Sequence, residues 1–381
     1  MKVRITFWRV VFALILPAGG YGTILRFTEG LGAATGLSDA FPWGLWVGFD
    51  VLCGVGLAAG GFTMAAAVHI FGGERFGPVI RPAILTAFLG YILVILALLI
   101  DLGRPWAIWH LLVMWNPDSV LFEVAWCVML YTAVLAVEFS PVVLERLGLR
   151  RALRWVRASL PVFVILGVLL STLHQSSLGS LYLVLPGKLH ALWYTPLLPY
   201  LFFLSALAVG CAMVVLESFL SQRAFGHMLP APLRGDLLRY AMVMLVPYAL
   251  LRVMDLVQRG AVGLAFEPTI EAALFQLEFV LGAVVPVALT AVRGIRSAPA
   301  GQAAIAGLVV LGFVLGRLNV GITGLEATLR AGYFPAWTEV AVTAMIVAIG
   351  FALFGLAARH LPIFGHVAGR GHAAPAGAVP R

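Results

Sequence analysis

Long apolar stretches separated by short polar connections run along almost the whole chain. Ten of them reach about 20 residues, the length with which a helix crosses about 30 Å of hydrocarbon. They cover residues 8–27, 43–70, 79–102, 119–141, 155–175, 192–220, 237–256, 271–293, 301–319 and 337–358. None alternates apolar and polar residues as a membrane-barrel strand does. The sequence therefore predicts an all-α integral membrane protein with about ten transmembrane helices.

The composition supports this prediction. Of the 381 residues, 62% are hydrophobic and only 11% are charged, which is more apolar surface than a water-soluble fold can bury. The net charge of +8 does not indicate a nucleic-acid partner, because the basic residues lie in short clusters between apolar stretches. The partner that this composition requires is the lipid bilayer.

Lys and Arg residues are distributed unevenly between the two sides of the predicted spans. Eighteen of the 25 lie near the N-terminus, in the connections after the second, fourth, sixth and eighth spans, or in the C-terminal tail. Because cytoplasmic segments carry an excess of basic residues, both termini are predicted to be cytoplasmic. Residues 1–360 would form one transmembrane domain, and the Gly-, Ala- and Pro-rich residues 361–381 are predicted to be a disordered cytoplasmic tail.

Short matches between the two halves of the chain suggest an internal repeat. The third span ends in D-L-G-R (101–104) and the seventh in D-L-V-Q-R (255–259), and the span that follows each opens with an acid, Glu123 or Glu278. These matches predict two pseudo-repeated four-helix bundles, spans two to five (about 43–175) and six to nine (about 192–319), plus one flanking helix on each side. Matches this short also arise by chance.

Polar side chains at membrane depth are costly, at about 2.5–3.5 kcal/mol for a charge, so each one needs a partner, water or a function. Most are expected in the outer third of the bilayer: Asp50, Glu123, His174, Arg252, Asp255, Glu278, Arg317 and Asn319, with Arg104 in the adjoining loop. A second set points towards the cytoplasm: His69, Arg81, Tyr91, Glu138 and Glu217. Together the two sets suggest a polar path that supplies protons to an outer pocket.

Structural roles would also explain several of these residues. Glu138 and Glu217 suit salt-bridged helix ends, and His69 suits a hydrogen-bonded packing position. Asp255 lies one turn from both Arg252 and Arg259, so it suits a structural ion pair.

Metal or haem ligation is not indicated by the sequence. Cys53, Cys127 and Cys211 are isolated in apolar segments, without metal-ligand spacing. A transmembrane haem needs histidines stacked across the bilayer, but no span carries two. No haem, iron–sulfur cluster or other metal is therefore predicted in this chain.

The outer polar residues suit a quinone, whose two carbonyl oxygens accept hydrogen bonds and whose reduction takes up two protons. Such a site needs an apolar slot, hydrogen-bond donors and a group that titrates near neutral pH. His174 is the natural donor and Glu123 the natural relay. Gln175 and Arg104 are further candidates, although the end of span five would equally explain Gln175.

Several motifs resemble the NrfD/PsrC-like family of quinone-interacting membrane subunits. They include F-P-W-G-L-W-V-G-F-D (41–50), W-N-P-D-S-V-L-F-E (115–123) and S-T-L-H-Q-S-S-L-G-S-L-Y (171–182). The resemblance extends over most of the chain, weakens after the sixth span, and is greatest for the HybB-like branch found in membrane-bound nickel-iron hydrogenases.

This resemblance implies a haem-free subunit in the bacterial inner membrane that binds menaquinone or ubiquinone near its outer face. It also implies a periplasmic ferredoxin-like iron–sulfur partner, which takes electrons from the hydrogenase large and small subunits. Residue by residue, it places Glu123 and His174 at the quinone and Asp50 near it, and it assigns Arg81, Tyr91, Glu138 and Glu217 to the proton path.

Other functions remain open at this stage. The same fold serves polysulfide, tetrathionate and sulfite-type molybdoenzymes, so the electron donor and the direction of electron flow are not determined. A proton-conducting transporter would show broken helices at the bilayer centre. A purely structural anchor would need no acids at membrane depth.

Overall fold

The computed structural model describes residues 7–184 and 187–364, and within them ten helical segments are long and apolar enough to cross a membrane. All ten predicted spans are confirmed, and the described residues contain no strand beyond an isolated bridge between Ser38 and Phe41. Seven spans are continuous helices: α1 (Phe7–Glu29), α5 (Gly77–Asp101), α7 (Val120–Leu147), α8 (Arg150–Leu183), α9 (Leu198–Phe225), α10 (Ala231–Gln258) and α16 (Trp337–His360).

Three spans change helical type along their length. The second consists of η1 (Trp46–Val51), α3 (Leu52–Leu57) and α4 (Gly60–His69), the eighth of α11 (Ile270–Phe279), η5 (Val280–Val284) and α12 (Val285–Ala291), and the ninth of α14 (Pro299–Leu318), η6 (Asn319–Thr323) and α15 (Gly324–Leu329). The segments η1, η5 and η6 are π-helical. Short helices α2 (Leu31–Ala34), η2 (Glu74–Phe76), η3 (Pro105–Ala107), α6 (His110–Val113), η4 (Val262–Phe266) and α13 (Arg293–Ser297) lie in the connections.

The second span is broken at Ala58 and Ala59, where the backbone forms a turn between α3 and α4. The amide of Ala59 donates to the carbonyl of Gly56 (3.0 Å), one residue short of the α-helical pattern. Gly60 meets Gly210 of α9 at this point, and a Cβ on Gly210 would lie 2.9 Å from the backbone of Ala59. Glycine on both helices therefore allows the break to pack directly against α9.

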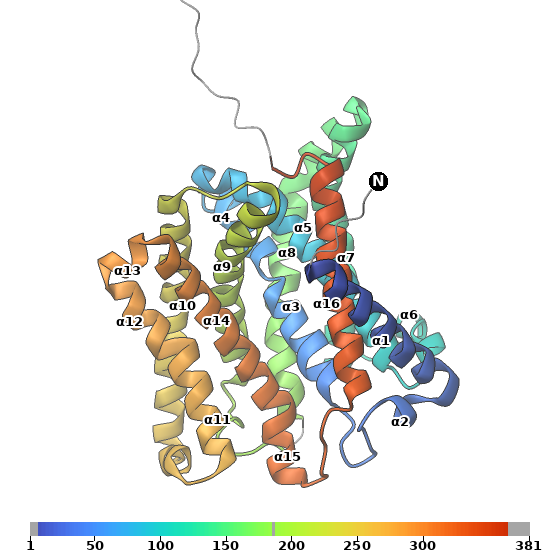
Figure 1. Ribbon diagram of the computed structural model, residues 1–381, viewed down its shortest axis with the longest axis vertical. Helices are drawn as coiled ribbons and strands as arrows, with labels where there is room; N and C mark the ends of the chain where they lie inside the picture. Colours follow the sequence, from blue (N-terminus) through green and yellow to red (C-terminus); the bar gives the residue numbers. More distant parts are fainter. Residues whose placement is uncertain (1–6, 185–186, 365–381) are drawn as a thin grey trace, which may run out of the picture.

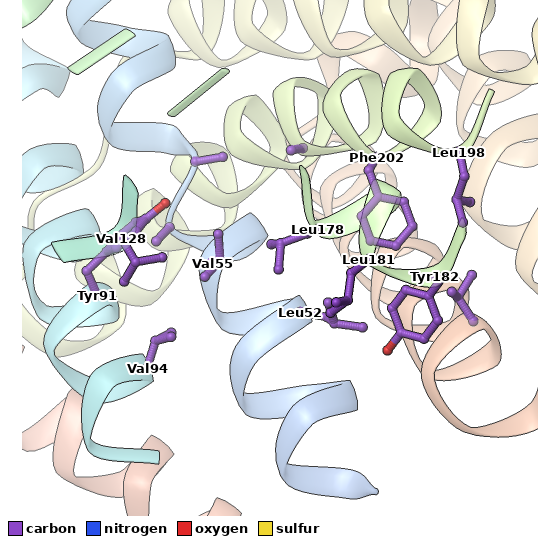
Figure 2. Close-up of a cluster of buried hydrophobic side chains, with 14 of the residues drawn as sticks. Leu52, Val55, Tyr91, Val94, Val128, Leu178, Leu181, Tyr182, Leu198 and Phe202 are labelled. Atoms are coloured by element: carbon purple, nitrogen blue, oxygen red, sulfur yellow. The ribbon is translucent and has the colours of Figure 1, made fainter. Parts of the chain in front are cut away.

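The helices pack as one bundle (Figure 1), in which α7, α8, α9 and α10 are successive neighbours and α1 lies along α16. Leu178, Leu181 and Tyr182 of α8 pack with Leu52 and Val55 of α3 in the apolar core shown in Figure 2. We refer to the end of the bundle that contains the α4–α5, α7–α8 and α9–α10 connections as the upper end, as it is drawn in Figure 1. The two-unit repeat remains a prediction.

Two predicted boundaries need correction. Helix α8 extends to Leu183, two turns beyond the predicted end of span five. The predicted tail is wrong for its first four residues, since Ile363 is buried and the carbonyl of Pro362 accepts a hydrogen bond from Arg81 (2.9 Å). Residues 365–381, for which disorder is predicted, lie outside the described residues.

Candidate functional site

His174 of α8 is fully buried against α5 and α7. Its ring contacts those of Tyr91 and Tyr131, with centroids 5.5 Å and 5.6 Å away. His174 lies nine residues before Leu183, about 14 Å along the helix axis. The sequence prediction that His174 ends its span at the outer face is therefore wrong, because the helix continues past it.

The hydrogen bonds of His174 identify its tautomer. Nδ1 lies 2.7 Å from the carbonyl oxygen of Leu170, which can only accept, so Nδ1 carries the proton. Nε2 is then the acceptor for the hydroxyl of Tyr91. The sequence assigned Tyr91 to the inward proton path. In the structure it is the hydrogen-bond partner of His174, the residue predicted to bind the quinone.

The buried face of α8 connects His174 to two further predicted residues. Gln175 donates from Nε2 to the carbonyl of Val55 (3.1 Å). In a regular α-helix this carbonyl would accept from the amide of Ala59, which donates to Gly56 instead. Ser177 donates to Glu123 Oε1 (2.7 Å) on α7. Ser177 lies three residues after His174 and therefore on the same face of α8. Through Ser177, Glu123 of α7 contacts that face.

An aromatic cluster flanks Glu123 on the outside of α7. The Trp115 ring lies 5.1 Å from that of Phe122 and 5.2 Å from that of Trp126, and its side chain is 66% exposed. Trp126 also donates to the carbonyl of Leu111 (3.0 Å), which holds the α5–α7 connection against α7. Glu123 therefore lies beside an apolar surface that is open to the surroundings.

Within the part of the chain that the structure describes, three buried polar atoms without hydrogen-bond partners lead from His174 towards the upper end: Ser171 Oγ, the Tyr131 hydroxyl and Glu138 Oε2. Gly167 makes room for them, because a Cβ there would lie 3.1 Å from Glu138 Oε1 and 3.4 Å from the Tyr131 ring. Buried polar atoms in proteins are normally satisfied, often by ordered water. This arrangement therefore suits a short water-bridged column between Glu138 and His174.

A cavity of about 220 Å³ lies at the upper end of this column. His69, Arg81, Glu138, Glu145 and Arg157 are among its lining residues. Glu145 pairs with Arg81 (2.9 Å) and Arg157 (2.5 Å), whereas Glu138 forms no ion pair with any residue that the structure describes. The cavity thus brings together three residues of the predicted proton path, His69, Arg81 and Glu138.

The remaining predicted residues lie elsewhere. Glu217 of α9 accepts from Thr86 (2.7 Å) and does not line the cavity. Asp50 of η1 accepts from Thr343 of the flanking helix α16 (2.8 Å), and Arg104 is exposed in the α5–α7 connection. The structure therefore does not bring these three together with His174.

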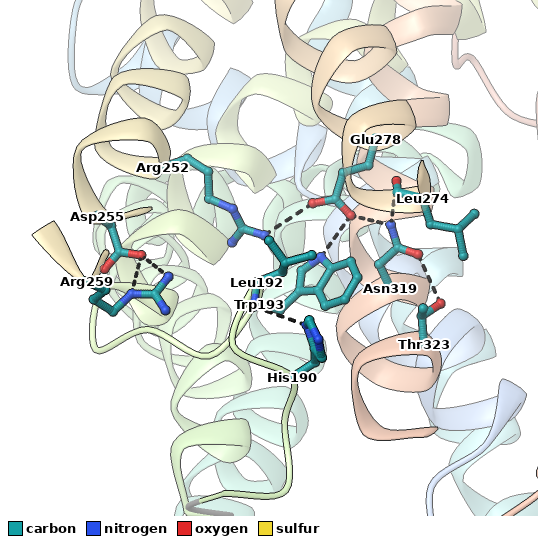
Figure 3. A network of polar contacts seen from close by, with 10 residues as sticks. All are labelled: His190, Leu192, Trp193, Arg252, Asp255, Arg259, Leu274, Glu278, Asn319 and Thr323. Carbon is teal, nitrogen blue, oxygen red and sulfur yellow. Dashed lines mark hydrogen bonds and ion pairs between the residues drawn. The ribbon is translucent and has the colours of Figure 1, made fainter. Parts of the chain in front are cut away.

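A second polar network lies in the other half of the chain (Figure 3). Glu278 accepts from Trp193 Nε1 (3.2 Å) and from Asn319, and pairs with Arg252 at 3.4 Å. Asp255 pairs with Arg259 (2.5 Å), so the predicted structural ion pair is correct for Arg259, while Arg252 turns to Glu278.

Tyr131 and Ser171 are the site residues that sequence reasoning missed. Spacing offered a signal for both, because Tyr131 lies seven residues before Glu138 and Ser171 three before His174, each on the same helix face. A buried tyrosine or serine in an apolar span is usually only a packing residue, so spacing alone did not distinguish them.

Residues 33–325 match the family described as polysulphide reductase, NrfD. This match covers well over half of the chain. The chain belongs to the NrfD family. The resemblance inferred from the motifs is thereby confirmed.

Three of its relatives match about nine tenths or more of the chain. A protein of Nitratidesulfovibrio vulgaris (strain Hildenborough) is 38% identical over 95% of each chain. The probable Ni/Fe-hydrogenase 2 b-type cytochrome subunit of Escherichia coli K12 is 33% identical over 89% of this chain and 88% of the relative. The menaquinone reductase integral membrane subunit of N. vulgaris is 29% identical over 94% of this chain and 91% of the relative.

Proposed function

We propose that this chain is the quinone-binding membrane subunit of an oxidoreductase complex, most closely of the nickel-iron hydrogenase type. Family membership and the names of the hydrogenase and menaquinone reductase relatives support this assignment. The observation that carries it is the buried His174–Tyr91 pair. This pair lies between Ser177 and Glu123 on one side and the column leading to Glu138 on the other.

The proposed position of the quinone head group is beside Glu123 and Ser177, against the Trp115 and Trp126 rings. This position offers an apolar aromatic approach from the bilayer together with polar groups at its end, the usual character of a small-molecule site. Glu123 in its protonated form would give the proton to the quinone carbonyl, with Ser177 holding its carboxyl group. His174 would hold the next proton as imidazolium, because Nε2 can take the proton of the Tyr91 hydroxyl while Tyr91 regains one from the column, and His174 would then reprotonate Glu123.

Protons would enter at the upper end, which the basic residues indicate to be cytoplasmic. The cavity would bring water to Glu138, and waters held by Tyr131 and Ser171 would bridge the carboxyl group to the His174–Tyr91 pair. Arg81 and His69 would line the entrance. Electron delivery from one side and proton uptake from the other would make turnover electrogenic, at about 2.3 kcal/mol per charge for each 100 mV.

Electrons would arrive from a periplasmic ferredoxin-like iron–sulfur subunit that contacts the lower end and connects to the hydrogenase large and small subunits. This chain would hold no haem. Nδ1 of His174 donates its proton to the Leu170 carbonyl and the lone pair of Nε2 accepts from Tyr91, so neither nitrogen is free to bind iron. Absence of a b-type haem absorbance from the purified complex would agree with this assignment, and a stoichiometric haem spectrum would overturn it.

The alternative of a proton-conducting transporter receives some support from the broken second span, a feature typical of transporters. However, Gln175 satisfies the carbonyl that the break frees, and α9 packs against it through Gly210. Proton flux through liposomes containing the complex, measured without an electron donor, would distinguish this function from quinone reduction.

The main test compares binding of a quinone analogue to the purified complex before and after single substitutions. Glu123→Gln and His174→Asn should each weaken binding and lower quinone-linked turnover. Glu271→Gln is the matched control, because Glu271 also lies in the first turn of a span, on α11. Equal binding by all three variants and the wild type would contradict the proposed site.

A further inference from the structure

A small cavity of about 20 Å³ lies inside the second half of the bundle, between α9, α10, α11 and α14. Its polar lining consists of Ser205, Tyr248, Arg252, Glu278 and Arg317. The space admits one particle of about the size of a water molecule. A quinone head group does not fit, so this site is separate from the one proposed above.

The charges around this cavity do not balance. Arg252 and Arg317 are 2% and 5% exposed, and within the described part of the chain Glu278 is the only acid that lines the space with them. Asp255, one turn from Arg252, is already neutralised by Arg259 at 2.5 Å. Two guanidinium groups thus share one carboxylate, which leaves one buried positive charge without an acidic partner.

Neighbouring groups compensate this charge only in part. Arg317 donates to the carbonyl of Phe202 and to Ser205 Oγ, both at 3.0 Å, and it lies over the Phe202 and Phe313 rings at 3.5 and 4.4 Å. Cation–π contacts and neutral acceptors stabilise a buried cation less than an opposite charge does. Moreover, Nε of Arg252 and Nε of Arg317 have no hydrogen-bond partner among residues 7–184 and 187–364.

We propose that this cavity binds a single monatomic anion, chloride under ordinary conditions, between Arg252 and Arg317. The ion would accept from the two free Nε–H groups and bring the local charge to zero. A water molecule fits the same space and can accept the same hydrogen bonds, but it leaves the positive charge uncompensated. The charge balance therefore favours the anion.

This assignment also gives Glu278 a role unlike that of Glu138. Glu278 is held by Arg252, Asn319 and Trp193, so its carboxylate acts as a fixed counter-charge. In contrast, Glu138 has a free oxygen next to a larger cavity. The anion would thus neutralise the buried positive charge in the second half of the bundle, while the first half keeps a polar column with unpaired groups.

The experiment is a thermal unfolding titration of the purified protein in which chloride replaces gluconate at constant ionic strength. We expect the Tm to rise by roughly 2 °C for each tenfold increase in chloride above the dissociation constant. Arg317→Gln removes the excess charge, so this variant should lose the chloride dependence. The matched control is Arg234→Gln. Arg234 is buried at the end of α10 opposite to Arg252 and donates to Gln302 Oε1 (2.8 Å), so this variant should keep the chloride dependence.

A second measurement keeps the proposal testable if Arg317→Gln does not fold. Crystals of the wild-type protein grown in bromide should show an anomalous peak in the cavity. A Tm that is the same in chloride and gluconate, a chloride dependence that survives in Arg317→Gln, or a cavity that contains only water would each overturn the proposal.

Discussion

At the scale of single residues, the candidate site depends on polar atoms that the protein itself does not satisfy. Among the described residues, the Tyr131 hydroxyl, Ser171 Oγ and Glu138 Oε2 are all buried without a hydrogen-bond partner, and Gly167 lies against both Tyr131 and Glu138. An unsatisfied buried polar group costs about 1–3 kcal/mol, so three neighbouring ones are best explained by bound water.

Tyr131→Phe tests this column directly. The substitution removes one hydroxyl and leaves the ring contacts, so folding and quinone-analogue binding should be unchanged, whereas quinone-linked turnover should fall roughly tenfold or more through slower proton delivery. Tyr182→Phe is the control, since the Tyr182 hydroxyl is also buried and has no partner among the described residues, but does not lie between His174 and Glu138. Equal turnover in the two variants would remove Tyr131 from the proton path.

At the scale of helices, the sequence predicted which segments span the membrane but not where they break. Hydropathy depends on each residue alone, and it identified all ten spans. The turn at Ala58 depends on two residues that are distant in the sequence. Gln175 donates a hydrogen bond to the carbonyl of Val55, and Gly210 allows α9 to approach the backbone of Ala59. No pattern within the second span contains that information.

The same limit explains the error for His174. Its depth follows from where α8 ends, and the polar residues after it suggested an end that the structure does not have. Gln175 and Ser177 instead donate to neighbouring helices, at the Val55 carbonyl and at Glu123. Of these residues only Ser171 lacks a hydrogen-bond partner in the described part of the chain. Polar residues that pair between helices thus resemble a helix end when they are read from the sequence.

Gly210→Ala tests the packing of the broken span against α9. A Cβ at this position would lie 2.9 Å from the backbone of Ala59, which cannot move as a flexible side chain can, so we expect destabilisation of about 1–3 kcal/mol. Gly307→Ala on α14 is the control, because its Cβ would meet nothing within 4 Å, and alanine should stabilise that helix by about 0.5–1 kcal/mol. Thermal unfolding in detergent measures both, and a Gly210→Ala variant as stable as the control would show that the contact is loose.

At the scale of the whole molecule, the proposed function requires the cavity and the quinone side to face opposite compartments. The cavity lies at the upper end, and the α5–α7 connection, which carries Trp115, lies at the opposite ends of α5 and α7. If the upper end is cytoplasmic, protons are taken from the cytoplasm and electrons from the periplasm. With the opposite orientation, protons would come from the periplasm and electrons from the cytoplasmic side, so turnover would move charge in the reverse direction.

Cysteine labelling decides between these orientations, because the native Cys53, Cys127 and Cys211 are all buried and should not react with a membrane-impermeant thiol reagent. Ala152→Cys places an exposed thiol in the upper end and Asn116→Cys places one in the α5–α7 connection. In intact spheroplasts, Asn116→Cys should be labelled and Ala152→Cys protected, and inverted vesicles should show the reverse. Labelling of Ala152→Cys from the outside would invert the bundle, and with it the direction of proton uptake, while leaving the contacts of His174 as described.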